Sequence, residues 1–228
     1  LAGVGAGSVM LGQIPSSIDA NALPSSVLLA SSFESALTWP TTGKVSVGAF
    51  APVRTGKQSL MIDRWHTGPY GVTIPRQIPS SGAYVGMANS IMTMPVSNYV
   101  GLMYATPYQG PNRKAKPVEL RLHDDRTMSI GVGSLQSPRT RWKAQIDAWF
   151  CTVLFIKRGN PARLSLDVYD CADTLADHVE LLADTRGSQN RHRIGGDQPI
   201  GTAYGQHYSW HDDFYIATQN LGPLKVVN

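Results

Sequence analysis

Residues 147–159, DAWFCTVLFIKRG, and residues 162–171, ARLSLDVYDC, decide the fold class of this chain. The first run is apolar almost throughout and rich in β-branched and aromatic residues, which predicts a central strand covered on both faces. In the second run apolar residues alternate with polar ones, which predicts a strand with one buried face. Gly, Asn and Pro at 159–161 are typical of a turn. The stretch therefore predicts an antiparallel hairpin.

The two cysteines lie one on each side of this turn. A hairpin centred near Pro161 sets Cys151 opposite Cys171, with Cβ atoms close enough for a disulfide. A reducing compartment would keep both as thiols, and a shift of the turn by one residue would separate them. The sequence therefore leaves the bridged and the free states open.

Similar strand patterns continue on both sides of the hairpin, separated by Gly and Pro. Residues 174–184, TLADHVELLAD, also have apolar residues at helical spacing, so helix and strand both remain open there. About a dozen strands with almost no helix predict a β-sandwich or barrel. From the alternation we expect these residues in the core: Phe33, Leu60, Trp149, Phe155, Leu166 and Phe214.

The composition limits the possible partners. The net charge is +4, but the basic residues are scattered, and we interpret their densest runs, 111–117, 137–143 and 186–193, as solvated loops. Nucleic-acid binding would need a basic stripe interleaved with aromatic residues, so we do not expect it. The sequence contains no run of about eighteen apolar residues, the length that a membrane span needs, so we expect no membrane span. We expect a soluble protein made inside a cell.

The triplet His-Asp-Asp occurs twice and could indicate a metal or proton-transfer site. Strands flank the first, so Asp124 and Asp125 are expected at a hairpin tip, where Asp accepts backbone N–H groups. The second opens a strand, and alternation places Asp212 and Asp213 on opposite faces, which suits no paired-carboxylate site. A zinc site at His211 would need further ligands from elsewhere. We predict that both triplets are architectural.

Sequence signatures of catalysis are absent: there is no G-x-S-x-G, H-E-x-x-H, P-loop or G-x-G-x-x-G after a strand. We therefore predict a protein that is not an enzyme, with no catalytic residue, no cofactor and no metal ligand.

Four stretches carry a family resemblance: VLLASSFES (27–35), GKQSLMI (56–62), the hairpin at 148–170, and WHDDFYIATQNLGPLKVV (210–227). Through them the chain resembles the concanavalin A-like lectin/glucanase superfamily, particularly the versions in phage virion proteins. The resemblance implies an all-β, jelly-roll antiparallel β-sandwich over residues 27–228, and it favours a strand at 174–184. It implies a structural role for Asp212 and Asp213 at the start of the last strand. The chain lacks the E-x-D-x-x-E motif of the glucanases, so hydrolysis is not expected.

Residues 1–26 are small and nearly uncharged, with Asp19 as the single charge. Such a segment buries too little surface to order itself, because each fixed residue costs about 1–2 kcal/mol of backbone entropy. We predict an extended N-terminal arm that leaves its own sandwich and orders on a neighbouring subunit; a frayed end is the alternative.

These features together predict a non-enzymatic structural component of a virus particle, such as a capsid decoration, tail or fibre protein. It would be located in the virion and would bind other virion subunits or copies of itself. The alternative is a carbohydrate-binding module, in which aromatic residues near loops stack on sugars: Trp65, Tyr70, Tyr108, Trp142, Tyr204 and Tyr208. A glycan hydrolase or lyase is a third class, but spacing favours no pair among its available acids, Glu34, Asp63, Glu119, Asp167 and Asp213.

Overall fold

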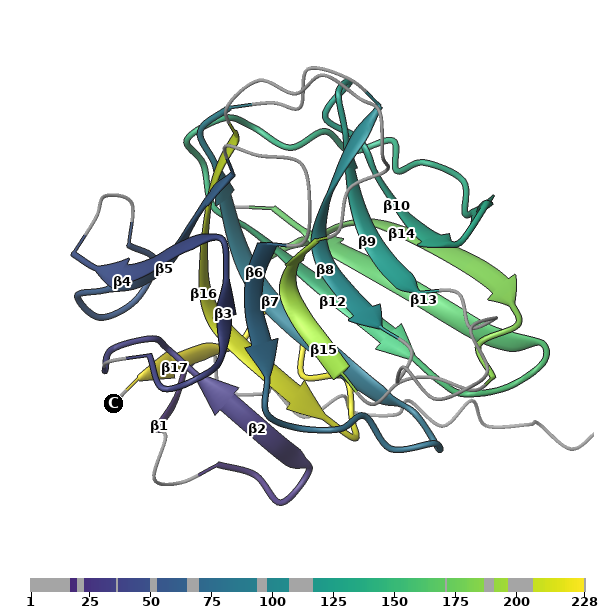
Figure 1. Cartoon of the computed structure of the whole chain (residues 1–228), viewed down its shortest axis with the longest axis horizontal. Helices are drawn as coiled ribbons and strands as arrows, with labels where there is room; N and C mark the ends of the chain where they lie inside the picture. The colour runs from purple at the N-terminus through teal and green to yellow at the C-terminus, as the bar shows by residue number, and fades with distance from the viewer. Residues whose placement is uncertain are drawn as a thin grey trace, which may run out of the picture.

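The computed structural model describes residues 17–19, 23–35, 37–49, 53–64, 70–93, 98–106, 117–170, 172–186, 191–196 and 207–227. Within these ranges all regular secondary structure is β-strand, and two antiparallel sheets face each other as a sandwich (Figure 1). The predicted jelly-roll β-sandwich is confirmed. None of the described residues belongs to a helix long and apolar enough to cross a membrane.

One sheet, the large sheet, has eight strands. Its order is β14 (Leu175–Ala183), β13 (Ala162–Tyr169), β12 (Phe150–Ile156), β7 (Ala83–Ile91), β16 (His207–Ala217), β5 (Ser59–Arg64) and β4 (Lys44–Gly48), with β2 (Val27–Ser31) also pairing with β16. The other, the small sheet, has seven. Its order is β11 (Leu135–Gln136), β10 (Met128–Val132), β9 (Val118–His123), β8 (Tyr99–Thr106), β15 (Arg191–Gly196), β6 (Tyr70–Ile74) and β3 (Thr41–Thr42).

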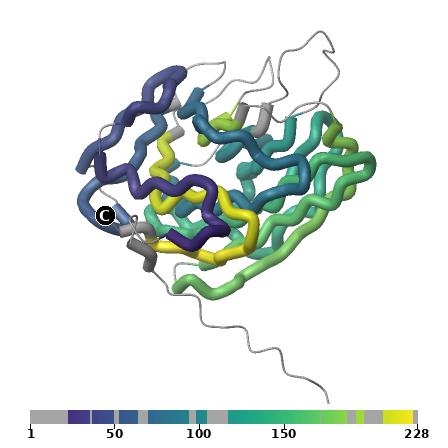
Figure 2. The backbone as a smooth tube through the Cα atoms, turned by 90° about the horizontal axis from the view of Figure 1, so that it is seen from below, coloured from purple at the N-terminus to yellow at the C-terminus, as the bar shows by residue number. Residues whose placement is uncertain are grey.

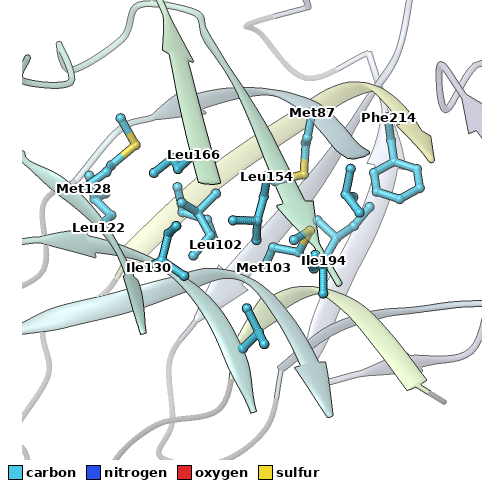
Figure 3. Packing of buried hydrophobic residues seen from close by; sticks show 14 of the residues in the cluster. Met87, Leu102, Met103, Leu122, Met128, Ile130, Leu154, Leu166, Ile194 and Phe214 are labelled. Atoms are coloured by element: carbon cyan, nitrogen blue, oxygen red, sulfur yellow. The ribbon is translucent and has the colours of Figure 1, made fainter. Parts of the chain in front are cut away.

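The core lies between the two sheets (Figure 3). Leu122 and Ile130 of the small sheet and Leu154, Leu166 and Phe214 of the large sheet are all fully buried there. Because successive side chains of a strand point to opposite faces, the inward row on each strand leaves an outward row. The outward rows carry the polar residues from which a site can be built.

The hairpin that decides the fold forms as predicted, but its register differs. Leu154 pairs with Leu166, and Cys151 pairs with Tyr169 rather than with Cys171, so the expected facing of the two cysteines is wrong. Cys171 lies outside the described residues. Cys151 is a buried free thiol, and burial raises its pKa to about 12.

Within residues 174–184, Leu175–Ala183 form strand β14, which pairs with β13 at the edge of the large sheet, so the helical alternative is wrong. The apolar spacing that suggested a helix includes Leu175 and Leu182, yet these side chains are 54% and 65% exposed. The helical periodicity therefore did not mark a buried face.

The core prediction holds for four of its six residues, because Phe33, Leu60, Leu166 and Phe214 are buried. It is wrong for Trp149 and Phe155, which are only half-buried. Phe150, Leu154 and Ile156 of β12 belong to the cluster between the sheets, whereas Phe155 points to the outer face and packs on Tyr84 with ring centroids 4.7 Å apart. The nearly continuous apolar run concealed this alternation.

Part of the N-terminal segment pairs with its own chain. Strand β1 (Ser17–Asp19) pairs in parallel with β17 (Lys225–Val227). In Figure 2 the purple strand β2 runs beside the yellow strand β16. For Ser17–Asp19 the expectation of an arm leaving its own domain is therefore wrong, because the C-terminal strand offers a free edge. Residues 1–16 and 20–22 lie outside the described residues, and contact with a neighbouring subunit stays a prediction.

The first His-Asp-Asp triplet ends strand β9 and enters the turn before β10, where it was expected. Asp125 accepts the backbone N–H of Thr127 at 3.0 Å and pairs with Arg139 at 3.0 Å. Burial acts to raise the pKa of Asp125, but the Thr127 hydroxyl and amide and Arg139 outweigh it and lower that pKa to about 2. These contacts are those of a turn that the carboxylate stabilises.

Candidate functional site

The second His-Asp-Asp triplet lies within strand β16 rather than at its start. A bulge interrupts the pairing of β16 with β7 between Asp212 and Tyr215, and Asp213 has a φ of 48°. The expected opposite orientation of the two carboxylates is therefore wrong, because both reach the same loop. Asp212 accepts the backbone N–H groups of Arg54 and Thr55 at 3.2 and 3.1 Å. Asp213 accepts the Thr55 hydroxyl at 2.7 Å and pairs with Arg54 at 2.8 Å.

These contacts hold residues 54–55 against the large sheet. Burial, and then the charge of Asp213, raise the pKa of Asp212 to about 7. Within the described part of the chain, no group of three His, Cys, Asp or Glu side chains has the arrangement of a metal site. The architectural role of Asp212 and Asp213 stays a prediction, which these contacts support.

The aromatic residues proposed to contact sugars do not share one environment. Trp65, Tyr108 and Tyr204 lie outside the described residues. Tyr70 is buried and donates its hydroxyl to the carbonyl of Gly101 at 2.8 Å. Tyr208 stacks on Trp210 with ring centroids 6.4 Å apart, and Trp142 packs on Phe150 at 5.5 Å.

A different group of residues gathers on the outer face of the small sheet. In strand β9, Val118, Leu120 and Leu122 point into the core, so Glu119, Arg121 and His123 lie on the outer face. All three polar side chains are nevertheless buried. Ionisable groups are almost never buried in this way unless they are paired, so this row differs from an ordinary solvated face.

Glu119 and Arg121 form a buried ion pair in which Arg121 Nη2 and Glu119 Oε2 are 2.6 Å apart. Arg121 also donates to the carbonyl of Gly133 at 2.9 Å, and its guanidinium lies 4.3 Å from the centre of the Tyr99 ring. A Cβ on Gly131 would approach the Arg121 guanidinium to 2.1 Å, so glycine makes the space in which Arg121 lies. These contacts together fix the position of the Arg121 side chain on the outer face of the small sheet.

His123 ends the row, and both of its ring nitrogens have hydrogen-bond partners. Its Nδ1 lies 3.2 Å from the carbonyl oxygen of Asn98, which can only accept, so Nδ1 carries the hydrogen. Its Nε2 shares a hydrogen bond with Ser129 Oγ at 2.8 Å. Burial, followed by the charge of Arg139, lowers the pKa of His123.

A bulge in strand β8 adds a second tyrosine to the same face. The pairing with β9 shifts between Gly101 and Met103, and both Leu102 and Met103 belong to the core. Tyr99 and Tyr104 are five positions apart and would otherwise point to opposite faces, but the shift places both outside. Tyr104 is then the direct partner of Glu119.

Strands β15 and β6 extend this row across the sheet. Arg193 pairs with Tyr104 on one side and with Thr73 on the other. The residues on each side of Arg193 point inward, because Ile194 is in the core and His192 accepts the N–H of Ile78 at 3.1 Å. The four strands β6, β15, β8 and β9 lie side by side (Figure 1). One line across them therefore presents a hydroxyl, a guanidinium, a phenol and a carboxylate.

Most of this row was missed in the sequence. Glu119 was one of five available acids, but Arg193 lies in the run 186–193, which was expected to be a solvated loop. That expectation is wrong where Arg191–Gly196 forms β15. The signal that was present is the alternation of Glu, Arg and His with Val and Leu at 118–123, which marks a polar outer face.

The fold is similar to that of several carbohydrate-active proteins of known structure. An endo-β-1,4-glucuronan lyase from the fungus Trichoderma reesei matches with a TM-score of 0.63 and 14% identity over 86% of this chain and 98% of that one. An alginate lyase from Chlorella virus matches with a TM-score of 0.57 and 8% identity over 80% and 93%. A carbohydrate esterase from the Shiga toxin-encoding bacteriophage phi24B matches with a TM-score of 0.53 and 10% identity over 80% and 90%. No protein-family model and no curated protein matches the chain.

At these identities the similarity establishes the fold. It also corrects the prediction of a non-enzymatic component of a virus particle, because the similar structures are named as lyases and an esterase, and none of the three as a capsid or tail component. The similarity therefore supports the jelly-roll β-sandwich fold, whereas it does not support the phage-virion version of the resemblance.

Proposed function

We propose that the chain is a carbohydrate-active enzyme that binds an acidic polysaccharide along the outer face of the small sheet and cleaves it by β-elimination. The observation that carries the proposal is the line of Arg193, Tyr104 and Glu119 on three adjacent strands. The names of the similar structures, two of them lyases, support the same class of reaction.

The preference for an acidic polymer follows from Arg193. A guanidinium presents a fork of N–H donors that matches a carboxylate with two parallel hydrogen bonds. Glu119 is already paired with Arg121, so it does not neutralise the cation of Arg193 as a lone carboxylate would. A sugar carboxylate can therefore take the place opposite Arg193.

Elimination needs two further actions at this place. When Arg193 neutralises the sugar carboxylate, the hydrogen on the adjacent ring carbon becomes more acidic. Tyr104, beside Arg193, is positioned to remove that proton as a phenolate that the guanidinium stabilises. The bond to the glycosidic oxygen then breaks, a carbon–carbon double bond forms, and the departing oxygen takes up a proton.

The test is to incubate the protein with glucuronan, alginate, polygalacturonate and a neutral β-glucan, and to follow the ultraviolet absorbance of unsaturated uronate. We expect unsaturated products from at least one acidic polymer and none from the β-glucan. Reducing ends without unsaturation would contradict elimination and indicate hydrolysis. Retardation in an affinity gel without any product would contradict catalysis and indicate a carbohydrate-binding module.

A further inference from the structure

A second place in the molecule has the chemistry of a sugar site. A cleft with a volume of about 140 Å³ lies where the segment after β11 reaches the start of β12 and the end of β13. Its lining consists of Trp142, Gln145, Ala148, Trp149, Phe150 and Asp170. None of these residues belongs to the row on the outer face of the small sheet.

Two half-buried tryptophans form the apolar part of this cleft. Trp142 is fixed, because its backbone N–H donates to Asp177 at 2.9 Å and its ring packs on Phe150. Trp149 has a buried indole N–H that donates to no acceptor among the described residues. Because that N–H has almost no accessible surface, Trp149 offers a ligand the surface of its ring rather than a hydrogen-bond donor.

Asp170 supplies an oriented acceptor. Its Oδ1 accepts the backbone N–H groups of Ala172 and Thr174, each at 2.9 Å, which fixes the carboxylate. Its Oδ2 accepts no hydrogen bond within the described part of the chain. The exposed amide of Gln145 adds one donor and one acceptor at the rim.

We propose that this cleft binds a single neutral sugar residue. Indole surface against the C–H face of a sugar ring, with a few oriented polar groups for its hydroxyls, is the composition expected of a small-molecule site. The volume is below the roughly 300–1,000 Å³ of drug-sized pockets, so it suits one ring rather than a chain. The carboxylate of Asp170 accepts from hydroxyl groups and repels a uronate.

The cleft and the small-sheet face therefore prefer opposite ligands, and the proposal does not depend on catalysis. The probes are the methyl glycosides of glucose, mannose, galactose, N-acetylglucosamine and glucuronic acid. The readout is the indole N–H signals of Trp142 and Trp149 in a nitrogen–proton correlation spectrum. Trp39, which packs between Phe33 and Phe214, is the internal reference.

We expect at least one neutral glycoside to shift both indole signals saturably, with a Kd on the order of 1 mM, and to leave Trp39 unchanged. The glucuronide should bind more weakly than the glucoside. No saturable shift with any neutral glycoside would overturn the proposal, as would tighter binding of the glucuronide.

Two variants assign the binding to the cleft. Asp170→Asn keeps an oxygen for the turn but removes the charged acceptor, and should weaken binding about tenfold. Gln145→Ala changes an exposed side chain, so the protein stays folded, and should weaken binding about threefold. Gln77→Ala, at an exposed position in another loop, is the control and should change nothing. Equal binding by all three variants would overturn the site, and acidic-polymer cleavage should be the same in all three.

Discussion

The two outer faces of the sandwich carry the same kind of ion pair in opposite surroundings. On the small sheet, the side chains of Arg121 and Glu119 are each 7% exposed. On the large sheet, Arg163 pairs with Glu180, and their side chains are 69% and 37% exposed. Both pairs join an arginine to a glutamate, so they differ in burial and not in composition.

The difference indicates where function belongs. Removing two charges from water costs several kcal/mol per ion, and their attraction offsets this only with good geometry and additional hydrogen bonds. The small sheet meets that condition with Gly133 and the Tyr99 ring. An exposed pair contributes about 0–1 kcal/mol and needs no such support. The large sheet also holds a buried pair, Arg54 with Asp213, but that pair fixes a loop. We place the proposed site on the small sheet because its buried pair lies beside Tyr104 and Arg193.

The largest effect is expected from breaking the buried pair. Arg121→Met leaves the Glu119 carboxylate buried without its partner and should lower the free energy of unfolding by about 3–5 kcal/mol. Arg163→Met, the matched change on the large sheet, should alter it by less than about 0.5 kcal/mol. Urea denaturation measures both. Similar losses for the two variants would show that the faces do not differ as described.

An intermediate effect is expected from the apolar part of the large sheet's outer face. Phe155→Ala should cost about 1–2 kcal/mol, because only part of the ring is removed from water. Phe214→Ala, in the core, should cost about 3–5 kcal/mol. Thermal and urea unfolding compare the two. If Phe155→Ala lowered the free energy of unfolding as much as Phe214→Ala, another segment or a partner would have to cover this face.

The smallest effect concerns one histidine on each face. Its hydrogen bond to Asp167, and then that to Glu180, raise the pKa of the exposed His178, whereas burial lowers the pKa of His123. The contribution of His178 is therefore present below pH 6.5 and lost as the pH rises through its raised pKa. His123 takes up a proton less readily when folded, so its contribution is lost as the pH falls below 6.5. Proton NMR titration should give His178 the higher pKa; the reverse order would contradict the assignment of the two environments.

The sandwich could be predicted because apolar and polar residues alternate along several of its strands. The run 162–171 and the run 117–124 each have one apolar face, and in the structure those faces are buried. The turn at 159–161 was evident from Gly and Pro. Register was less predictable, because turn residues locate a loop only to within a residue or two. Cys151 therefore pairs with Tyr169 and not with Cys171 as expected.

The site was predictable only in part. The outward row of β9 follows from alternation, but its burial depends on the strands and loops that surround it. Tyr104 joins that row through a bulge, for which the sequence of β8 gives no signal. Arg193 lies in a short strand with two glycines, which resembles a loop in composition. Pairing between strands distant in sequence brought these residues together.

The most direct test of the account compares two arginines in one assay. Arg193→Ala and Arg163→Ala remove the same group from the outer faces of the small and large sheets, and melting temperatures check that both variants fold. With the acidic polymer that the wild type cleaves, Arg193→Ala should slow the release of unsaturated product by about 100–1,000-fold, the effect typical of losing one charge-stabilising group. Arg163→Ala should stay within about twofold of the wild type. Equal rates for the two variants would contradict the assignment of the site to the small sheet.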